Sequence, residues 1–366
     1  MSESWSTKGS STTNTGCRCS EPIEVEHMVA AGLRGLAGGR LVDLKHIVGC
    51  GRSAIYDCFD DFIDAVNDAP ELDINFPQTL EGWQRVNNGF RRKSSNQILH
   101  GCVGALDGFF QRSNRPTVLE AANTLSYYSG HYESYGVNCQ ACVKSDLQFL
   151  YFGVISPGST NDNVSYNLAE GLRELFENLP LGLYGVADAA YTLSESILIP
   201  FTGADRQDKA HDAFNYYLSQ LQIRVEIAFG RMVNKFRILS GKIEGSIDRV
   251  SAILTACARL HNFIIQQDGP FDVSTNDNMA LDRDTDDLEI HANPRAPLGM
   301  SYLPTIPDES FLAYQGISQT RVAHVDHLRS QDIGRPLHNI VRKRRELAVV
   351  VSANGCLIDR EYVSPL

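Results

Sequence analysis

The chain has 366 residues, of which 43% are hydrophobic and 21% are charged, and its formal net charge at pH 7 is −11. This length allows one or two domains with a sizeable core, and the composition is that of an ordinary soluble protein. No stretch reaches the roughly 18 uninterrupted apolar residues of a membrane helix, so no membrane partner is expected. Residues 1–11 lack an apolar signal-peptide core, and the nine cysteines have no regular spacing. Both features predict a reducing, non-secretory compartment.

Much of the negative charge lies in one short stretch, opposed only by Arg283: Asp268, Asp272, Asp277, Asp282, Asp284, Asp286, Asp287 and Glu289. This composition predicts a disordered acidic linker over residues 267–310. Basic residues cluster elsewhere, at Arg85, Arg91, Arg92, Lys93, Arg224, Arg231, Lys235, Arg237 and Lys242. The negative net charge therefore does not exclude a nucleic-acid partner.

Residues 1–25 are rich in Ser, Thr and Gly and are predicted to be disordered. Residues 26–97 have helical patterns, with a glycine turn at residues 49–51 followed by an amphipathic helix. A helix, a turn and a second helix resemble a helix-turn-helix DNA-binding unit. An αα-hairpin without a DNA role is the alternative, since the second helix is acidic, with Asp57, Asp60, Asp61 and Asp64.

From residue 98 to 266 short apolar strands alternate with helical patterns. We expect strands at 102–107, 136–143, 149–155 and 183–187, and helices at 167–179, 211–238 and 247–266. The polar residues 144–146 predict a β-hairpin between the second and third strands. This order suits an α/β sheet with helices packed on it, and a ligand in such a sheet lies beyond the strand ends.

Three acidic residues are the candidate catalytic and metal-binding residues. Asp107 and Asp188 are each expected at the end of a short apolar strand, and Glu226 lies on the polar edge of a long helix. Mg²⁺ prefers carboxylates with waters and phosphate oxygens, and two such ions about 3.5–4 Å apart can drive phosphodiester cleavage. Taken singly, each residue has a structural alternative: an Asp-Gly turn, a helix cap and a solvated helix glutamate.

Other polar residues are weaker candidates. Asp162 lies in a Gly/Ser/Asn loop and either binds substrate, orients the site or caps the loop. Tyr191 and His261 are polar site candidates, with a packed aromatic and a satisfied helix histidine as the alternatives. Arg231 and Lys235 are four residues apart on one helix, so they share a side that could meet a DNA backbone. Cys139 and Cys142 face opposite sides of a predicted strand, which argues against zinc.

Eight short segments, taken together and in this order along the chain, form a family pattern: Gly104-Ala105-Leu106-Asp107-Gly108, Gly158-Ser159-Thr160-Asn161-Asp162, Ala187-Asp188-Ala189-Ala190-Tyr191, Pro200-Phe201, Phe214-Asn215, Arg224-Val225-Glu226-Ile227-Ala228-Phe229-Gly230-Arg231, Phe236-Arg237-Ile238-Leu239 and Leu260-His261-Asn262. Over residues 30–266 this series resembles the DDE-type endonuclease of PIF/Harbinger transposases and their domesticated relatives. Two segments depart from the family pattern, which has Gly-Thr-His after the first aspartate and histidine before the loop aspartate. Here the chain has Gly108-Phe109-Phe110-Gln111 and Asn161.

The resemblance implies an α/β, RNase H-like DDE catalytic domain at residues 98–266, preceded by a small all-helical, helix-turn-helix-like domain. It implies that Asp107, Asp188 and Glu226 hold two Mg²⁺ or Mn²⁺ ions. The implied reaction cuts transposon ends by water attack and joins the 3′-hydroxyl to target DNA. The resemblance also implies a Myb-like partner protein for DNA binding and nuclear import.

Our first interpretation is a metal-dependent DNA endonuclease of this kind, with Arg231, Lys235 and Arg237 on the DNA backbone and a homo-oligomer as a further expected partner. A domesticated, inactive DNA- or protein-binding factor is the second, and a phosphohydrolase of small substrates the third. The basic run Arg342-Lys343-Arg344-Arg345, in a tail (311–366) without an assigned fold, is a candidate nuclear import signal.

Overall fold

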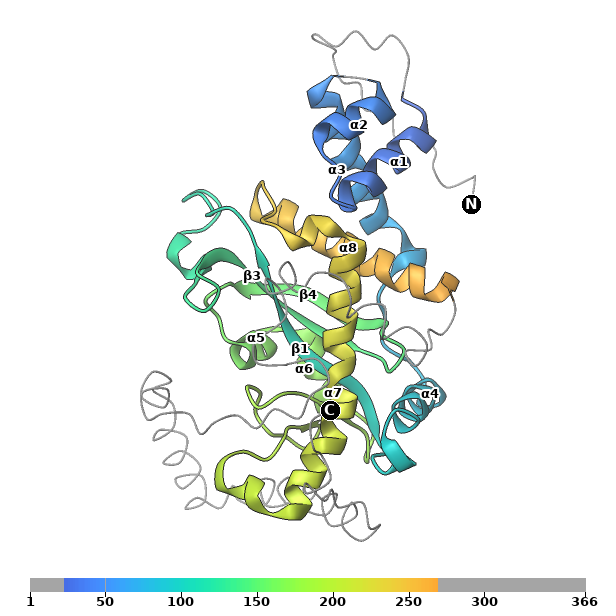
Figure 1. Cartoon of the computed structure of the whole chain (residues 1–366), viewed down its shortest axis with the longest axis vertical. Helices are drawn as coiled ribbons and strands as arrows, with labels where there is room; N and C mark the ends of the chain where they lie inside the picture. The colour runs from blue at the N-terminus through green and yellow to red at the C-terminus, as the bar shows by residue number, and fades with distance from the viewer. Residues whose placement is uncertain (1–22, 50, 269–366) are drawn as a thin grey trace, which may run out of the picture.

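A computed structural model describes residues 23–49 and 51–268 (Figure 1). The predictions for residues 1–22, for most of the acidic linker and for the tail with its basic run lie outside the described residues. The helices are α1 (Val25–Leu36), α2 (Leu41–Val48), α3 (Arg52–Asp68), α4 (Leu80–Arg91), α5 (Asp162–Leu168), α6 (Glu170–Glu177), α7 (Lys209–Lys235) and α8 (Ile247–Asp268). The strands are β1 (Cys102–Arg112), β2 (Tyr128–Ser129), β3 (Ser134–Val143), β4 (Phe149–Pro157), β5 (Tyr184–Val186) and β6 (Ile197–Leu198). Within the described ranges, no helix has the length and apolar character needed to cross a bilayer.

The strands form one mixed sheet in the order β4-β3-β1-β5-β6, with β2 paired to the start of β3. β1 and β4 each run antiparallel to β3, whereas β5 and β6 are parallel to β1. The predicted hairpin is confirmed, because β3 and β4 pair directly across the turn after Val143. The α/β class is confirmed, and the mixed sheet with its helices is consistent with an RNase H-like fold.

Side chains alternate along β1, and each of its faces meets a different helix layer. On one face, Gly104 lies against the Phe176 ring of α6. On the other, the Phe109 ring packs on Phe229 of α7, with 5.1 Å between ring centroids. The long helix α7 crosses the sheet in Figure 1 and contacts both β1 and β3. The sheet is therefore covered on both faces, which buries its central strand.

The prediction that the first strand ends at Asp107 is wrong. β1 continues for five more residues and pairs with β3 as far as Arg112, opposite Gly136. The aromatic residues after Asp107 explain the extension, since the Phe110 ring stacks on Tyr132 with 4.3 Å between centroids. Asp107 is therefore in the middle of a strand, and the Asp-Gly turn is also excluded.

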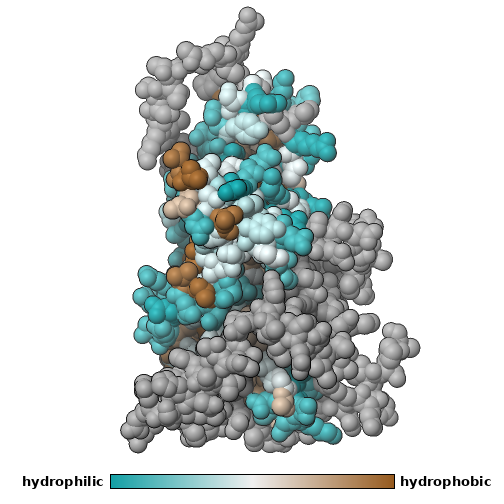
Figure 2. All heavy atoms as spheres, turned by 90° about the vertical axis from the view of Figure 1, so that its left-hand side faces the viewer, coloured by the Kyte–Doolittle hydropathy of each residue, from teal (hydrophilic) through white to brown (hydrophobic). Residues whose placement is uncertain are grey.

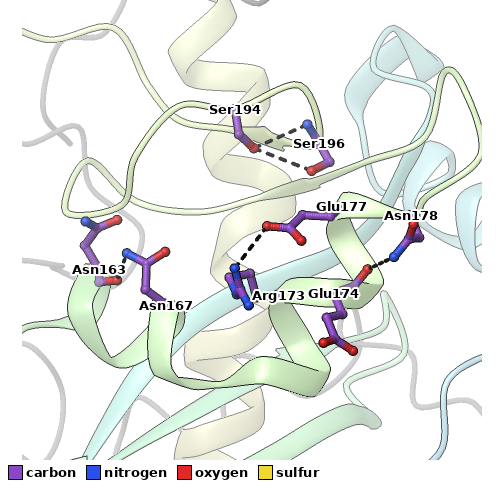
Figure 3. A network of polar contacts seen from close by, with 8 residues as sticks. All are labelled: Asn163, Asn167, Arg173, Glu174, Glu177, Asn178, Ser194 and Ser196. Carbon is purple, nitrogen blue, oxygen red and sulfur yellow. Dashed lines mark hydrogen bonds and ion pairs between the residues drawn. The ribbon is translucent and has the colours of Figure 1, made fainter.

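The helix predicted at 167–179 corresponds to α6, and most of α5 forms before that range, beginning in residues that were predicted to be a loop; the two helices meet at the buried Ala169. Figure 3 shows the polar bonds that hold them. The Asn167 side chain donates to the Asn163 carbonyl at 2.8 Å, and Arg173 pairs with Glu177 at 3.5 Å. The two-residue strand β6 was not predicted, because two residues give no periodic pattern. The two last helices are confirmed, with α7 beginning after the N-cap Asp208.

Helices α1, α2 and α3 form an all-helical unit at one end of the molecule, whereas α4, which was predicted to belong with them in residues 26–97, packs on β1 (Figure 1). Gly32 and Gly35 of α1 lie directly under the rings of Phe62 and Phe59 of α3, where a β-carbon would collide with the rings. These glycines let the two helix backbones approach closely. The opposite side of α3 exposes Asp57, Asp61 and Asp64.

Helix α3 also docks on α8, which packs on the sheet. Arg249 of α8 forms an ion pair with Asp60 at 2.9 Å and lies over the Tyr56 and Phe59 rings, with its guanidinium carbon 5.7 and 5.8 Å from their centroids. With its buried side on α1 and α8, α3 presents an acidic surface, which repels DNA phosphates.

The surface of the described residues in Figure 2 is mostly hydrophilic, with hydrophobic side chains in separate spots. Exposed large hydrophobic residues of the described chain include Val118, Leu119, Leu125, Leu168 and Leu181. Singly scattered apolar residues are normal on soluble proteins.

The buried His261 confirms the prediction of a satisfied helix histidine. It is 4% exposed, and its Nε2 donates to the Leu147 carbonyl at 2.9 Å, since a carbonyl oxygen can only accept. Burial lowers the pKa of His261 to about 4. The next residue, Asn262, bonds both the amide and the carbonyl of Phe149. Together they fasten α8 to the start of β4.

Acid should destabilise the fold through His261. The unfolded chain takes up this proton near pH 6.5, whereas the folded chain takes it up only near pH 4. The free energy of unfolding should therefore fall as the pH drops through this window, by up to roughly 3 kcal/mol from this residue. His261→Gln keeps an amide donor for Leu147 and removes the titration. Urea denaturation between about pH 7 and 4 should show a weaker pH dependence for the variant, and parallel curves would contradict this assignment.

Candidate active site

The register between β1 and β5 places the two aspartates. The strands run parallel and pair Ala105 with Val186, where β5 ends. Two residues further along each chain, Asp107 and Asp188 reach the same level at the carboxyl end of β5. Asp107 accepts a hydrogen bond from the Gly108 amide at 2.8 Å, and Asp188 accepts one from the Ala190 amide at 2.8 Å. The predicted position of Asp188 after a strand is confirmed.

Glu226 approaches from α7, as predicted. One helical turn earlier, Gln222 donates to the Leu106 carbonyl at 2.8 Å, which fixes this part of the helix against β1 beside Asp107. Residues four apart share a side of a helix, so Glu226 lies on the same side as Gln222. Its side chain is exposed, unlike the half-buried Asp107 and Asp188. Glu226 therefore stands at the solvent edge of the site.

Asp162 is the fourth carboxylate, and it comes from the other face of β1. It is the first residue of α5, after the N-cap Asn161, which accepts from the Val164 amide. Asp162 itself accepts from the Asn138 side chain at 3.1 Å. A β-carbon at Gly108 would fall on the Asp162 carboxylate, so only glycine permits this approach. The loop-capping role expected for Asp162 belongs to Asn161 instead.

The four carboxylates act on one another electrostatically. The pKa of Asp107 is raised well above its ordinary value, first by burial and then by the charges of Asp188, Asp162 and Glu226. Burial also raises the pKa of Asp188 and of Glu226, with further contributions from Asp162 and Asp188 respectively. Glu226 is exposed to solvent, yet enough protein lies around its carboxylate to raise its pKa. The fold holds four acids together that repel one another.

The comparisons with known proteins agree with this geometry. Residues 106–262 match the family described as DDE superfamily endonuclease, and this range contains all four carboxylates. Residues 106–262 are therefore similar to DDE superfamily endonuclease domains. A protein named "Protein ALP1-like" from Arabidopsis thaliana is 26% identical over 262 residues, which cover 68% of this chain. The matched region spans 62% of that relative's length. No solved structure matches the chain.

The donor chemistry of the four carboxylates fits a divalent cation. Carboxylate oxygens are the ligands that Mg²⁺ uses, commonly one or two of them with waters and substrate phosphates. No group of three or more His, Cys, Asp and Glu side chains in residues 23–49 and 51–268 is arranged to hold a metal ion by itself. Water, substrate phosphate or a shift of side chains would have to complete the coordination shell.

Two residues beside the carboxylates were missed by the sequence analysis. Tyr132 stacks on Phe110, and burial together with the charges of Asp162 and Asp107 raises its pKa to about 12. His131 is exposed and lies edge-on to Tyr132 at 4.7 Å between centroids. Burial raises the pKa of Asp162, and the charge of His131 partly opposes this. Both lie in the connection between β1 and β3, whose only sequence signal is its density of tyrosines.

Apart from the residues proposed for the DNA backbone, the remaining candidates are buried. Tyr191 is buried and donates to the Gln140 side chain at 2.8 Å. Cys139 and Cys142 are buried free thiols in β3, in agreement with their structural interpretation.

The three residues proposed for the DNA backbone are not equally placed. Arg231 is half-buried, and burial lowers its pKa although the charge of Asp268 on α8 opposes this. Lys235 and Arg237 are exposed at the end of α7. Arg237 lies beside Gly38, where a β-carbon would come within 3.0 Å of it. The exposed pair therefore lies next to the N-terminal helical unit.

Replacing Gly108 should disturb the site and the fold. In Gly108→Ala the new methyl group meets the Asp162 carboxylate, so α5 or β1 must shift, and we expect a loss of about 1–3 kcal/mol in the free energy of unfolding. Gly171→Ala on α6 is the matched control, because nothing lies within 4 Å of its added carbon. That variant should be neutral or more stable by about 0.5–1 kcal/mol. Equal stability of the two variants in urea denaturation would disprove the close approach of Asp162.

Proposed function

We propose that this protein is a divalent-metal-dependent DNA endonuclease of the PIF/Harbinger transposase type, which cuts transposon ends and joins them to target DNA. One observation carries the proposal. Asp107 comes from β1, Asp188 from the segment that follows β5, and Glu226 from α7. Their charges nevertheless act on one another, within the region that matches the endonuclease family. Three acids that converge from separate elements, and that form no ion pair with a basic side chain within the described residues, are suited to a cation site.

The position of each carboxylate suggests which ion it would bind. Asp107 and Asp188 would hold Mg²⁺ or Mn²⁺ from the protein side, and Glu226 would complete a second ion site at the solvent edge. When bound, two such ions supply an activated water and neutralise charge on the leaving oxygen. The chain itself orients the carboxylates: the Gly108 and Ala190 amides hold Asp107 and Asp188, and Gln222 fixes the helix that carries Glu226.

DNA is the proposed substrate, held on its phosphates by Lys235 and Arg237 with Arg231 behind them. The acidic surface of α3 leaves the N-terminal unit poorly suited to phosphate contact by that helix. This supports the proposal that a Myb-like partner protein supplies DNA recognition. Nuclear entry through Arg342–Arg345 and assembly of a homo-oligomer are further proposals, which rest on sequence and resemblance.

A second candidate is a domesticated factor that kept the fold and lost the chemistry. It is favoured by the lack, within the described residues, of three acidic, histidine or cysteine side chains already arranged for a metal ion. The two departures from the family pattern, at Phe109-Phe110-Gln111 and Asn161, lie on the strand and the helix cap next to Asp107 and Asp162. These residues therefore bear on catalysis directly.

Nicking of supercoiled plasmid tests the two candidates. The wild-type protein, supplied with a Myb-like partner, should nick DNA with Mn²⁺ or Mg²⁺ and lose this activity in EDTA. Asp188→Ala should reduce nicking by at least about 100-fold, as expected when a group that stabilises charge in the transition state is lost. Glu174→Gln, a change of an exposed acid on α6, is the matched control and should be active. DNA binding without nicking in every protein would favour the domesticated factor.

The salt dependence of DNA binding tests the proposed backbone contacts. Each lost phosphate contact should reduce the slope of log K against log salt by about 0.9. Lys235→Ala and Arg237→Ala should each show this change. Lys209→Ala, exposed at the opposite end of the same helix, should keep the wild-type slope. Unchanged slopes in all three variants would place the DNA on another surface.

A further inference from the structure

A chain of buried polar side chains leads from the Asp188 segment to Asp162. The Tyr191 hydroxyl donates to Gln140 Oε1 at 2.8 Å, and Gln140 Nε2 donates to Asn138 Oδ1 at 3.2 Å. Asn138 Nδ2 then donates to Asp162 Oδ1 at 3.1 Å. Tyr191, Gln140 and Asn138 are 1%, 0% and 7% exposed. We call these three residues the relay.

The surroundings of Asn138 determine the direction in which the hydrogen bonds of the relay donate. Asn138 Nδ2 faces two oxygens, the Thr160 carbonyl at 3.2 Å and the Asp162 carboxylate. An amide oxygen in that place would accept from neither, so the amide must point its nitrogen there. Its oxygen then faces the Gln140 nitrogen, and the Gln140 oxygen faces the Tyr191 hydroxyl. Every donor in the relay therefore points toward Asp162, which is its terminal acceptor.

A second bond ties the same two segments together. The Thr192 amide donates to Asn163 Oδ1 at 3.0 Å, so the residues that follow Asp188 and Asp162 are joined directly as well as through the relay. Asn163 is in turn part of the polar contacts that hold α5, as Figure 3 shows. Asp162 and Asp188 are thus mounted as one unit, although 26 residues separate them in the chain.

Burying three polar side chains under a sheet stabilises a fold less than an apolar core of the same volume. We therefore expect these side chains to have a further role, which is to fix the direction in which the Asp162 carboxylate points. Gly108 has no side chain, and this lets the Asp162 carboxylate lie directly against β1 next to Asp107. The charge of Asp162 acts on both Asp107 and Asp188 at that edge.

We propose that Asp162 is a fourth carboxylate of the metal site, and that Tyr191, Gln140 and Asn138 are positioning residues that direct it toward Asp107 and Asp188. This inference rests on the proposed metal-dependent function. The alternative is that the relay only stabilises the packing of α5 on the sheet. The two differ in one respect: a positioning relay acts on metal affinity only through Asp162.

Mn²⁺ binding to the full chain without DNA, measured by the loss of the free-ion electron paramagnetic resonance signal, separates these cases. Asp162→Asn should weaken Mn²⁺ affinity by at least about tenfold, and Tyr191→Phe and Asn138→Ala should each weaken it by about tenfold, as for residues that orient ligands. In the Asp162→Asn background, Tyr191→Phe should have no further effect on affinity. Glu174→Gln should bind as the wild type does. Circular dichroism establishes that each variant is folded.

The outcomes are distinct. If the wild type binds Mn²⁺ and Asp188→Asn abolishes this, but Asp162→Asn binds as tightly as the wild type, the fourth-ligand proposal is wrong while the proposed function stands. If Tyr191→Phe weakens binding equally with and without Asp162, or lowers only thermal stability, the relay is structural and the positioning proposal is overturned. If the wild type binds no Mn²⁺, the metal-dependent function fails, and this inference with it.

Discussion

The pairing of β1 with strands of opposite direction on its two sides is the constraint on which the rest of the structure depends. Its antiparallel partner β3 runs along most of its length, from Val143 to Gly136, while its parallel partner β5 covers only its first residues. The sheet is therefore closed on one side of Asp107 and open on the other. That opening is where the segment carrying Asp188 turns away, so one register determines the position of both aspartates.

The site stores electrostatic repulsion that the surrounding packing has to offset. Four acids with raised pKa values stand at the open edge, and their mutual repulsion opposes folding. The aromatic contact of Phe109 with Phe229 and the bond from Gln222 to Leu106 hold α7 in place against it. A bound cation would relieve the same repulsion and would therefore stabilise the folded state.

The N-terminal helical unit is fastened to α8 by ion pairs and ring contacts rather than linked to it loosely. Arg249 pairs with Asp60 and covers the Tyr56 and Phe59 rings, and Arg259 pairs with Asp73 at 2.8 Å. These contacts use charges of α8 to neutralise part of the acidic α3 region. They also fix how α3 and the segment around Asp73 lie against α8.

The sequence by itself determined the α/β class, the hairpin, the long helices and the identity of the acidic residues, because apolar periodicity and motif order are local properties. It misplaced the end of β1, since Gly108 reads as a turn unless one knows that Asp162 lies over it. It also predicted one helix at 167–179, where α6 forms after a separate helix α5, and it gave no sign of the relay. Only the tertiary structure decided which carboxylates meet, that Arg231 lies against α8, and that α3 turns an acidic face to solvent. Those outcomes depend on strand register and on contacts between residues tens of positions apart, which no local pattern of side chains encodes.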